Sequence, residues 1–468
     1  MDSEQTLSAW LPDLLYDGKR WHYDTALVCD AGGRVVDLVP ATEVSGMMIR
    51  LPNQALLPGM VNAHSHAFQR VIRGRTEHRS GASRDSFWTW REMMYSAVTR
   101  LTPEDIYDAS RMTFLEMALS GITTVGEFHY LHHAPDGRPY DDVNLLAKAV
   151  VQAALDVGLR IALMRVAYFR AGYQQAPDPQ QARFIETGAE RFIQNAETLR
   201  LNLGREQPGR AWMGVAPHSV RAAGLPELRS IAEYAARREL PLHMHVAEQP
   251  AELEACLSEH SRTPVDLLAE NGILSPSFTG VHGIHLTERE IEQLAFAGAN
   301  ICACPTTERN LGDGIIPADR LFAAGISLSL GSDSHAQIDL LEDARELEYH
   351  LRLQRLERNV LAPADPSPSA LAARLFDCAT IGGARSVGFD GGVLAPGRPA
   401  DFFTIDLKDP SIAGSSLDDL LANIVFGSVR SSVRDVVVGG QPMVAAGTHQ
   451  VQADIVDRFT TLQKKLWS

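Results

Sequence analysis

Residues 58–70 read PGMVNAHSHAFQR and place two histidines, His64 and His66, directly after the apolar run QALLPGMV. Side chains two residues apart on a β-strand point to the same face. An apolar run of this kind is typical of a buried strand, so both imidazoles are expected to leave the end of that strand in one direction. The residues at the ends of the other predicted strands should then indicate which side chains surround the two imidazoles.

Seven further apolar runs follow along the chain, and nearly all are apolar at the start and polar at the end. They read TTVGEFHY, RIALMRVAYF, AWMGVAPHSV, LPLHMHVAEQ, FTGVHGIH, NICACPTTE and ISLSLGSDSH. Segments between them, such as PEDIYDASRMTFLEMALSG and LPELRSIAEYAARREL, carry apolar residues at helical spacing. Alternating strands and helices predict a parallel sheet, and eight such units predict a TIM-like (β/α)8 barrel of the α/β class.

The two ends of the chain do not continue this alternation. Residues 24–57 read as short strands with turns, and so do residues 390–447, which include DFFTIDLKD and SVRDVVVGGQPMVAAG. We therefore expect a small β-sandwich domain built from residues 1–57 and 391–447, beside a catalytic barrel of residues 58–390. The last stretch, residues 448–468, is predicted to form a C-terminal helix.

The composition is that of a globular protein, with 45% hydrophobic and 22% charged residues in a chain of 468. A net charge of −15 argues against a nucleic acid or an anionic membrane as partner, and an anionic substrate would need a local cationic site. Five cysteines without a CxxC pair indicate buried thiols in a reducing compartment. The N-terminal residues show neither a signal peptide nor a membrane span, so we expect a cytoplasmic protein.

Metal-ligand side chains stand at the ends of the first, fifth and eighth predicted strands. His64 and His66 end the first, His245 lies in HMHVAEQ and Asp333 lies in GSDSH. The active site of a (β/α)8 barrel lies at the C-terminal ends of its strands. Three imidazoles and a carboxylate suit one Zn²⁺ ion with room for a water, and Fe²⁺ or Mn²⁺ would also fit. Each motif alone is weak, and their joint occurrence in barrel order predicts the metal site.

Alternatives stay open around this set. His243 shares a strand face with His245, so either could be the ligand; we favour His245 because Glu248 then follows at His-x-x-Glu spacing. Cys302 and Cys304 alternate on the seventh run, but two thiols in a buried strand are more typical of a core. The third and fourth runs end without a lysine or acid that could bridge a second metal, which predicts a mononuclear site.

A metal-bound water with a pKa near 7 could attack a C=N or C=O carbon, and that attack needs proton transfer. Glu248, three residues after the predicted ligand, could carry a proton to the departing nitrogen. His282 in VHGIH could hold or polarise the nucleophile, and Asp333 could accept the water proton as well as bind the metal. His282 and His285 could instead be loop histidines without a direct role.

Together, PGMVNAHSHAFQR, HVAEQ, VHGIH, GSDSH and the closing GGVLAPGRPADFFTID resemble the amidohydrolase superfamily, and the resemblance covers essentially the whole chain. Within it, HSHAFQR, DSFWTWREMMY, EFHYLHH, PHSVRA, TTERNLGDGIIPA and GSDSH resemble the formimidoylglutamate deiminases of histidine degradation. This resemblance implies a zinc-dependent hydrolysis of N-formimino-L-glutamate to N-formyl-L-glutamate and ammonia, by an enzyme that is a homodimer.

The resemblance also implies a role for each motif residue. One Zn²⁺ per subunit would be held by His64, His66, His245 and Asp333, with Glu248, His282 and Asp333 as the catalytic residues. The substrate would be bound by Gln69, Arg91, Tyr130, His218 and Arg221. Two arginines and a tyrosine hydroxyl can bind two carboxylates through charge-assisted hydrogen bonds. Alternatively, the aromatic run around Arg91 packs on the barrel rim and Arg221 pairs with a surface acid.

Two other functions compete with this hypothesis. The first is another mononuclear member of the superfamily, a deaminase or chlorohydrolase acting on a purine, pyrimidine or triazine. Those flat, uncharged rings would not require Arg91 and Arg221. The second is a metal-free scaffold protein of the same fold, which predicts missing ligands, whereas all four are present in this sequence.

Overall fold

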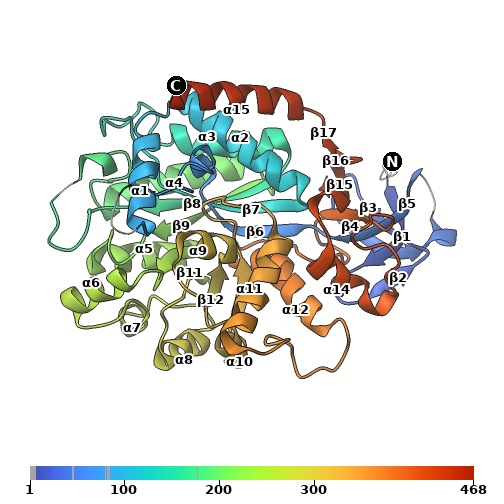
Figure 1. Ribbon diagram of the computed structural model, residues 1–468. Coiled ribbons are helices and arrows are strands. Elements are labelled where there is room, and N and C mark those ends of the chain that lie inside the picture. Colours follow the sequence, from blue (N-terminus) through green and yellow to red (C-terminus); the bar gives the residue numbers. More distant parts are fainter. Residues whose placement is uncertain (1–6, 45–46, 80, 82–84, 177) are drawn as a thin grey trace.

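The computed structural model describes residues 7–44, 47–79, 81, 85–176 and 178–468 (Figure 1). All eight predicted runs form strands, namely β6 (Met60–Ser65), β7 (Ile122–His129), β8 (Arg160–Ala167), β9 (Ala211–Pro217), β10 (Leu242–Val246), β11 (Phe278–His282), β12 (Asn300–Ala303) and β13 (Ser327–Leu330). Consecutive strands pair in parallel from β6 to β13. This confirms the predicted (β/α)8 barrel.

The first and last barrel strands meet at their C-terminal ends. Ser65 and Asp333 form a parallel bridge, and the backbone N–H of Asp333 donates to the carbonyl of His64 over 3.0 Å. Asn62 adds two side-chain hydrogen bonds, because its Nδ2 donates to Oγ of Ser332 over 2.7 Å and its Oδ1 accepts the Ser332 N–H over 3.0 Å. The sheet is therefore closed at the edge where the predicted ligands stand.

Helices cover the outside of the barrel (Figure 1). They are α1 (Phe87–Val98), α2 (Pro103–Leu119), α3 (Leu145–Val157), α4 (Ala189–Glu206), α5 (Leu225–Arg238), α6 (Pro250–His260), α7 (Pro264–Glu270), α8 (Glu288–Ala297), α9 (Pro305–Leu311), α10 (Ala318–Ala323), α11 (Leu340–Arg355), α12 (Ala370–Asp377) and α13 (Gly383–Ser386). Helix α2 begins where Thr102 and Asp105 cap each other's backbone N–H, with Pro103 in the first turn. Thr287 and Glu290 form the same reciprocal cap at α8.

Both ends of the chain join one mixed sheet beside the barrel. Its strands are β1 (Ser8–Tyr16), β2 (Trp21–Tyr23), β3 (Thr25–Cys29), β4 (Val35–Pro40), β5 (Met47–Pro58), β14 (Phe402–Asp406), β15 (Val433–Val438), β16 (Gln441–Ala445) and β17 (Thr448–His449). Strand β14 pairs with β5, which joins the N-terminal and C-terminal segments in one sheet as the sequence predicts. The division of the chain into domains at particular residues stays a prediction.

A single glycine links this sheet to the barrel. Gly59 lies between β5 and β6, and a Cβ atom there would come within 2.3 Å of the Thr123 side chain. The chain can therefore pass from one sheet into the other without a loop, because only glycine fits against that side chain. The placement of β6, and with it His64 and His66, follows directly from β5.

Two helices connect the terminal segments to the barrel. Helix α14 (Leu417–Gly427) lies between β14 and β15 along the chain and packs against α11 and α12. Helix α15 (Gln452–Trp467), the predicted C-terminal helix, packs along α2, where Nζ of Lys465 lies 2.6 Å from Oδ2 of Asp105 (Figure 1).

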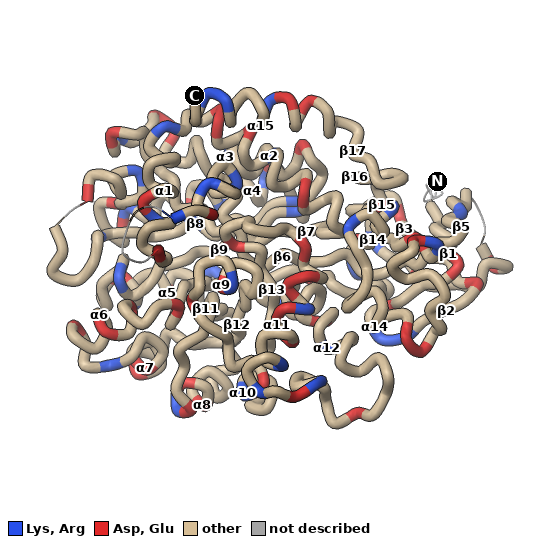
Figure 2. Tube along the Cα trace, viewed as in Figure 1, with Lys and Arg blue, Asp and Glu red and all other residues tan. Residues whose placement is uncertain are grey.

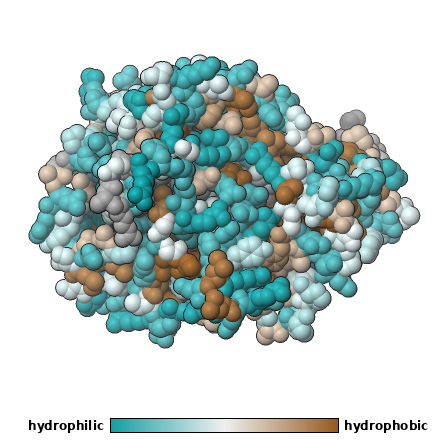
Figure 3. Space-filling model, viewed as in Figure 1, coloured by the Kyte–Doolittle hydropathy of each residue, from teal (hydrophilic) through white to brown (hydrophobic). Residues whose placement is uncertain are grey.

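The surface is charged with both signs. Figure 2 shows acidic and basic residues interspersed along outer helices such as α8 and α15. In the face shown in Figure 3, hydrophobic patches are small and separated by hydrophilic surface. All five cysteines are buried and unpaired, as expected. Within the described part of the chain, no helix is both long and apolar enough to cross a membrane.

Candidate metal centre and active-site pocket

Four side chains from three strand ends meet at the closed edge of the barrel. One ligand atom each of His64, His66, His245 and Asp333 lies within 4.8 Å of the other three. The Nε2 atoms of His64 and His66 are 3.2 Å apart, and they lie 3.4 Å and 3.3 Å from Oδ1 of Asp333. All four residues are buried. The predicted ligand set thus comes together in space, although the chain separates its members widely.

In His66 and His245, the ring nitrogen that faces away from this group contacts a backbone carbonyl. Nδ1 of His66 lies 2.9 Å from the carbonyl oxygen of Phe128, and Nδ1 of His245 lies 3.1 Å from that of His218. A carbonyl oxygen only accepts, so Nδ1 carries the proton and Nε2 presents a lone pair. Nitrogen lone pairs turned toward one another and toward a carboxylate fit a cation between them. The donor set of three imidazoles and one carboxylate is of the kind that holds zinc.

The protonation states agree with a metal centre. Burial lowers the pKa of His64 to about 3 and also lowers the pKa values of His66 and His245, so these imidazoles are neutral near pH 7. Burial alone would raise the pKa of Asp333, but its hydrogen bond to His64 and the nearby imidazoles lower it below its ordinary value. Neutral imidazoles and an ionised carboxylate are the forms that bind metals.

A buried carboxylate supports the two histidines of β6. Oε2 of Glu127 accepts a hydrogen bond from the hydroxyl of Ser65 over 2.5 Å, and its Oε1 accepts the N–H of Ala67 over 2.7 Å. Glu127 lies on β7 and thus contacts residues on both sides of His66. Such contacts hold metal ligands in one orientation before the metal binds.

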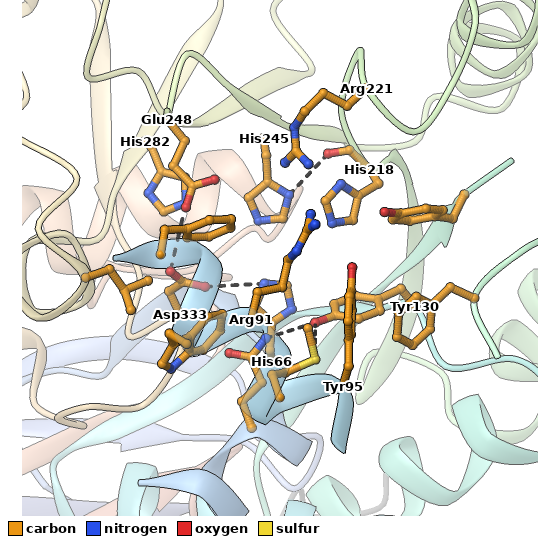
Figure 4. Close-up of a pocket in the computed structure, with 17 residues that line it drawn as sticks. His66, Arg91, Tyr95, Tyr130, His218, Arg221, His245, Glu248, His282 and Asp333 are labelled. Atoms are coloured by element: carbon orange, nitrogen blue, oxygen red, sulfur yellow. Dashed lines mark hydrogen bonds and ion pairs between the residues drawn. The ribbon is translucent and has the colours of Figure 1, made fainter. Parts of the chain in front are cut away.

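Glu248 and His282 lie beside the ligand group. Nε2 of His282 is 3.7 Å from Oε1 of Glu248 and 3.9 Å from Oδ2 of Asp333 (Figure 4). Burial raises the pKa of Glu248, and the charge of Asp333 adds to this effect. Burial would lower the pKa of His282, but the carboxylates of Glu248, Glu308 and Asp333 raise it well above its ordinary value. These groups can therefore exchange protons next to the ligand set.

The backbone is strained at three of the strand ends that carry these residues. Ala247, His282 and Asp333 have φ angles of 52°, 74° and 45°, in the left-handed region that residues other than glycine seldom adopt. Conformations of this kind cost on the order of 1–3 kcal/mol each and are found most often at functional sites. Here they turn the chain immediately after β10, at the end of β11 and after β13.

The ligand group opens into a pocket that contains two arginines. Cζ of Arg91, on α1, lies 4.5 Å from the ring centre of Trp88 and 5.3 Å from that of Tyr95. Arg221 follows β9, and its side chain and that of Arg91 extend to the same side of the pocket (Figure 4). Burial opposes the charge of Arg221, but nearby Glu252 and other anionic groups raise its pKa, so the guanidinium stays charged.

Every residue predicted for substrate binding lines this pocket, namely Gln69, Arg91, Tyr130, His218 and Arg221. Nε2 of Gln69 donates to the hydroxyl of Tyr130 over 2.9 Å. Burial and the charge of Arg221 lower the pKa of His218 well below its ordinary value, which keeps that imidazole neutral. The geometry brings these side chains together; their roles with a substrate stay predictions.

The structure also separates His243 from His245. Nε2 of His243 lies 2.7 Å from the carbonyl oxygen of Ser386, whereas His245 belongs to the ligand group. Cys302 is buried in the core, as expected. Cys304 is also buried, and its sulfur lies within 4.8 Å of ligand atoms of His282 and Glu308.

Sequence reasoning missed several residues of the site, Glu127 among them. Tyr95 and Tyr168 line the pocket, Glu252 lies behind Arg221, and Glu308 contacts His282. A signal existed for two of them, because Tyr95 follows Arg91 by four residues on a helix and Tyr168 comes directly after β8. The buried glutamates gave no such signal, since nothing in the local pattern tells a pocket acid from a helix-cap acid.

Comparisons with known proteins agree with this fold and site. Residues 55–443 match the Amidohydrolase family. The chain is 38% identical over 92% of its length to a formimidoylglutamate deiminase of Pseudomonas aeruginosa, with 93% of that protein covered. It is 32% identical over 89% of its length to an 8-oxoguanine deaminase of the same organism, with 88% of that protein covered. A crystal structure of an amidohydrolase from Brucella melitensis superposes with a TM-score of 0.90 at 34% identity, over 98% of this chain and all of that one.

The chain belongs to the amidohydrolase family. Together with the closed barrel and the group of three histidines and one aspartate, this membership defines a hydrolase that acts on carbon–nitrogen bonds. The relatives differ in substrate, one being a formimidoylglutamate deiminase and another an 8-oxoguanine deaminase by name.

Proposed function

We propose that this enzyme hydrolyses N-formimino-L-glutamate to N-formyl-L-glutamate and ammonia, in histidine degradation. The observation that carries the proposal is the pair of arginines, Arg91 and Arg221, in the same pocket as the ligand group. The substrate has two carboxylates, and guanidinium groups bind carboxylates through paired, charge-assisted hydrogen bonds. In a chain with a net charge of −15, these cations supply the local positive potential that an anionic substrate needs.

The metal that we propose is one Zn²⁺ per subunit, held by His64, His66, His245 and Asp333, with Fe²⁺ as the alternative. When bound, zinc lowers the pKa of a coordinated water from 15.7 to about 7 and so makes a nucleophile available at neutral pH. The neutral imidazoles and the ionised carboxylate of this site fit that ion.

The proton transfers fall to Glu248, His282 and Asp333. In the proposed reaction the water oxygen forms a bond to the formimino carbon, and the terminal C–N bond breaks. Over the reaction the water loses two protons, the first as it adds to the carbon and the second as the new hydroxyl becomes the formyl carbonyl. Asp333 and His282 accept these protons in turn, and Glu248 delivers both to the formimino =NH nitrogen, which leaves as ammonia. In the free enzyme Nε2 of His282 lies 3.7 Å from Glu248 and 3.9 Å from Asp333, which is longer than a hydrogen bond. Catalytic contacts of this kind often shorten when the substrate binds.

The substrate contacts that we propose come from Gln69, Arg91, Tyr130, His218 and Arg221. Arg91 and Arg221 would each bind one carboxylate, with the Tyr130 hydroxyl as a further donor. Tyr95 and Tyr168 add phenol groups to the same wall. This arrangement would direct the formimino group toward the four metal ligands.

The main alternative is a deaminase of a purine or another flat ring, as the name of one relative suggests. Such a ring carries no carboxylate, so Arg91 and Arg221 would have no anionic group of the substrate to bind. A metal-free scaffold is a weaker alternative, because all four ligand side chains converge. We place the enzyme in the cytoplasm, since its five cysteines are unpaired; the homodimer stays a prediction.

The test is ammonia release by the zinc-loaded protein with formiminoglutamate, guanine and adenosine as substrates. We expect turnover of formiminoglutamate alone. Arg221→Gln should raise KM for formiminoglutamate by about tenfold to a hundredfold, since a hydrogen bond to a charged group is worth roughly 1.5–3 kcal/mol. Arg229→Gln, at an exposed arginine on α5 that pairs with Asn271, is the matched control and should behave as wild type. Turnover of guanine or adenosine in preference, or an unchanged KM in Arg221→Gln, would disprove the proposal.

A further inference from the structure

Glu308 stands behind His282 and has no place in the reaction described so far. It lies in α9, directly after β12, and is 1% exposed. Its Oε1 accepts the backbone N–H of Cys304 over 2.8 Å and lies 3.3 Å from Nδ1 of His282. Its own backbone carbonyl accepts the N–H of Asp313 over 3.0 Å. One backbone N–H thus holds the carboxylate, and the same carboxylate oxygen is turned toward one imidazole.

The opposite edge of that imidazole, which carries Nε2, faces the proposed proton-transfer groups. Nε2 of His282 points toward Glu248 and Asp333, at 3.7 Å and 3.9 Å. A carboxylate on Nδ1 holds the proton on that nitrogen and leaves Nε2 free to exchange one. The ring of His282 also stacks on that of His245, with ring centres 5.5 Å apart, which fixes its plane but not which nitrogen faces the pocket. The contact with Glu308 therefore determines which nitrogen of the ring keeps its proton.

A second metal is the competing explanation for this cluster, since ligand atoms of His282, Cys304 and Glu308 lie within 4.8 Å of one another. A thiol must lose its proton to bind a metal. Burial raises the pKa of Cys304 well above its ordinary value, and Oε1 of Glu308 already accepts the Cys304 N–H. The geometry is better explained by a hydrogen-bonded carboxylate–imidazole pair.

We propose that Glu308 is the positioning residue of His282: its carboxylate binds Nδ1–H, fixes the tautomer and holds Nε2 toward Glu248 and the metal-ligand group. The inference rests on the proposed hydrolytic role of His282. Carboxylates behind active-site histidines change affinity or activity by about 10-fold to 100-fold in metal sites. Loss of Glu308 should therefore slow the reaction without weakening substrate binding.

Two variants of nearly equal side-chain volume separate positioning from packing. Glu308→Gln keeps an oxygen that can accept from Cys304 and from Nδ1–H of His282, whereas Glu308→Met keeps the volume and removes the acceptor. We expect kcat to fall about 10-fold to 100-fold in Glu308→Met and by less than about fivefold in Glu308→Gln. KM and zinc content should stay at wild-type levels in both. Glu290→Gln, at an equally buried glutamate that caps α8, is the control and should leave kcat unchanged.

A readout without substrate keeps this test independent of the proposed function. In ¹⁵N-histidine-labelled protein, the Nδ1–H resonance of His282, assigned by its loss in His282→Asn, should be visible in wild type and Glu308→Gln and absent in Glu308→Met. If wild type shows this resonance but does not hydrolyse formiminoglutamate, the proposed function fails and the positioning role stands. Wild-type kcat in Glu308→Met, a kcat loss matched by zinc loss, or a resonance that persists in Glu308→Met would overturn the inference.

Discussion

His66 follows the first barrel strand and Asp333 follows the last, and the two residues make two contacts, one through the backbone and one through the side chains. The backbone N–H of His66 donates to the carbonyl oxygen of Asp333 over 3.1 Å, and Nε2 of the one lies 3.3 Å from Oδ1 of the other. The same contact therefore closes the barrel and brings two metal ligands together. Stability of the closed sheet and affinity for the metal should be coupled for this reason.

The two histidines of β10 provide a matched pair for identifying the ligand. His245→Asn should reduce bound zinc from about one ion per chain to a small fraction and abolish activity, because it removes one of four ligands. His243→Asn should keep the zinc, since His243 contacts the Ser386 carbonyl instead. Metal analysis of both purified variants checks this expectation. Zinc lost from His243→Asn but kept by His245→Asn would reverse the assignment.

Glu248→Gln should lower kcat by about 100-fold to 10,000-fold, the range for loss of a general acid–base group. Bound zinc and KM should change little, because Glu248 is not in the ligand group. Steady-state kinetics with metal analysis measures all three quantities. Glu254→Gln, at an exposed glutamate on α6, the helix that follows Glu248, is the control. Equal kinetics of the two variants would exclude Glu248 from proton transfer.

Asn62→Leu should destabilise the closure of the barrel. The substitution removes both hydrogen bonds to Ser332 and leaves the buried N–H of that serine without its partner, whereas its hydroxyl keeps its contact with Nδ1 of His335. We expect the free energy of unfolding to fall by about 2 kcal/mol, the usual cost of an unsatisfied buried polar group. Urea unfolding of the zinc-free protein measures this change. A difference below about 0.5 kcal/mol would mean that these hydrogen bonds do not stabilise the closed sheet.

Glu252 should make stability depend on pH. Burial raises its pKa from 4.5 to about 7, so the folded protein holds a proton that the unfolded chain has already released. Its contribution to stability is full below about pH 4.5 and is lost as pH rises through about 7, by about 3 kcal/mol at 1.36 kcal/mol per unit. Glu252→Gln keeps the acceptor for the Glu248 N–H but cannot titrate. Free energies of unfolding, measured for wild type and Glu252→Gln from pH 4.5 to 8, should therefore be similar at low pH, and wild type should fall below the variant as pH rises. Parallel curves of free energy against pH would contradict the prediction.

The barrel strands were predictable because parallel strands buried on both faces read as continuous apolar runs. The polar residues at their ends stood out for the same reason: His64, His245 and Asp333 each interrupt or follow an apolar run. The ligand set could therefore be named before any geometry was known. The substrate residues came from the resemblance to a family, since no periodicity distinguishes Arg221 from an arginine on a surface loop.

What escaped prediction lies where the chain leaves regular structure. Strand periodicity places His243 and His245 on one face, and only their depth in the barrel separates a core histidine from a ligand. Glu252 and Glu308 stand in helices that follow strand ends, and whether an acid there faces the pocket depends on the turn before the helix. The left-handed backbone conformation at His282 occurs in one of those turns, and the residue type at that position does not predict it.

By itself, the amino-acid sequence determined the order of strands and helices and the residue types at each strand end, because burial and hydrogen bonding constrain short segments locally. Only the tertiary structure decided which of those residues share a site. Closure through Ser65 and Asp333 converts distances along the chain into contacts of a few ångströms. The path of the turns then selects which carboxylates, Glu308 among them, face the imidazoles at the centre.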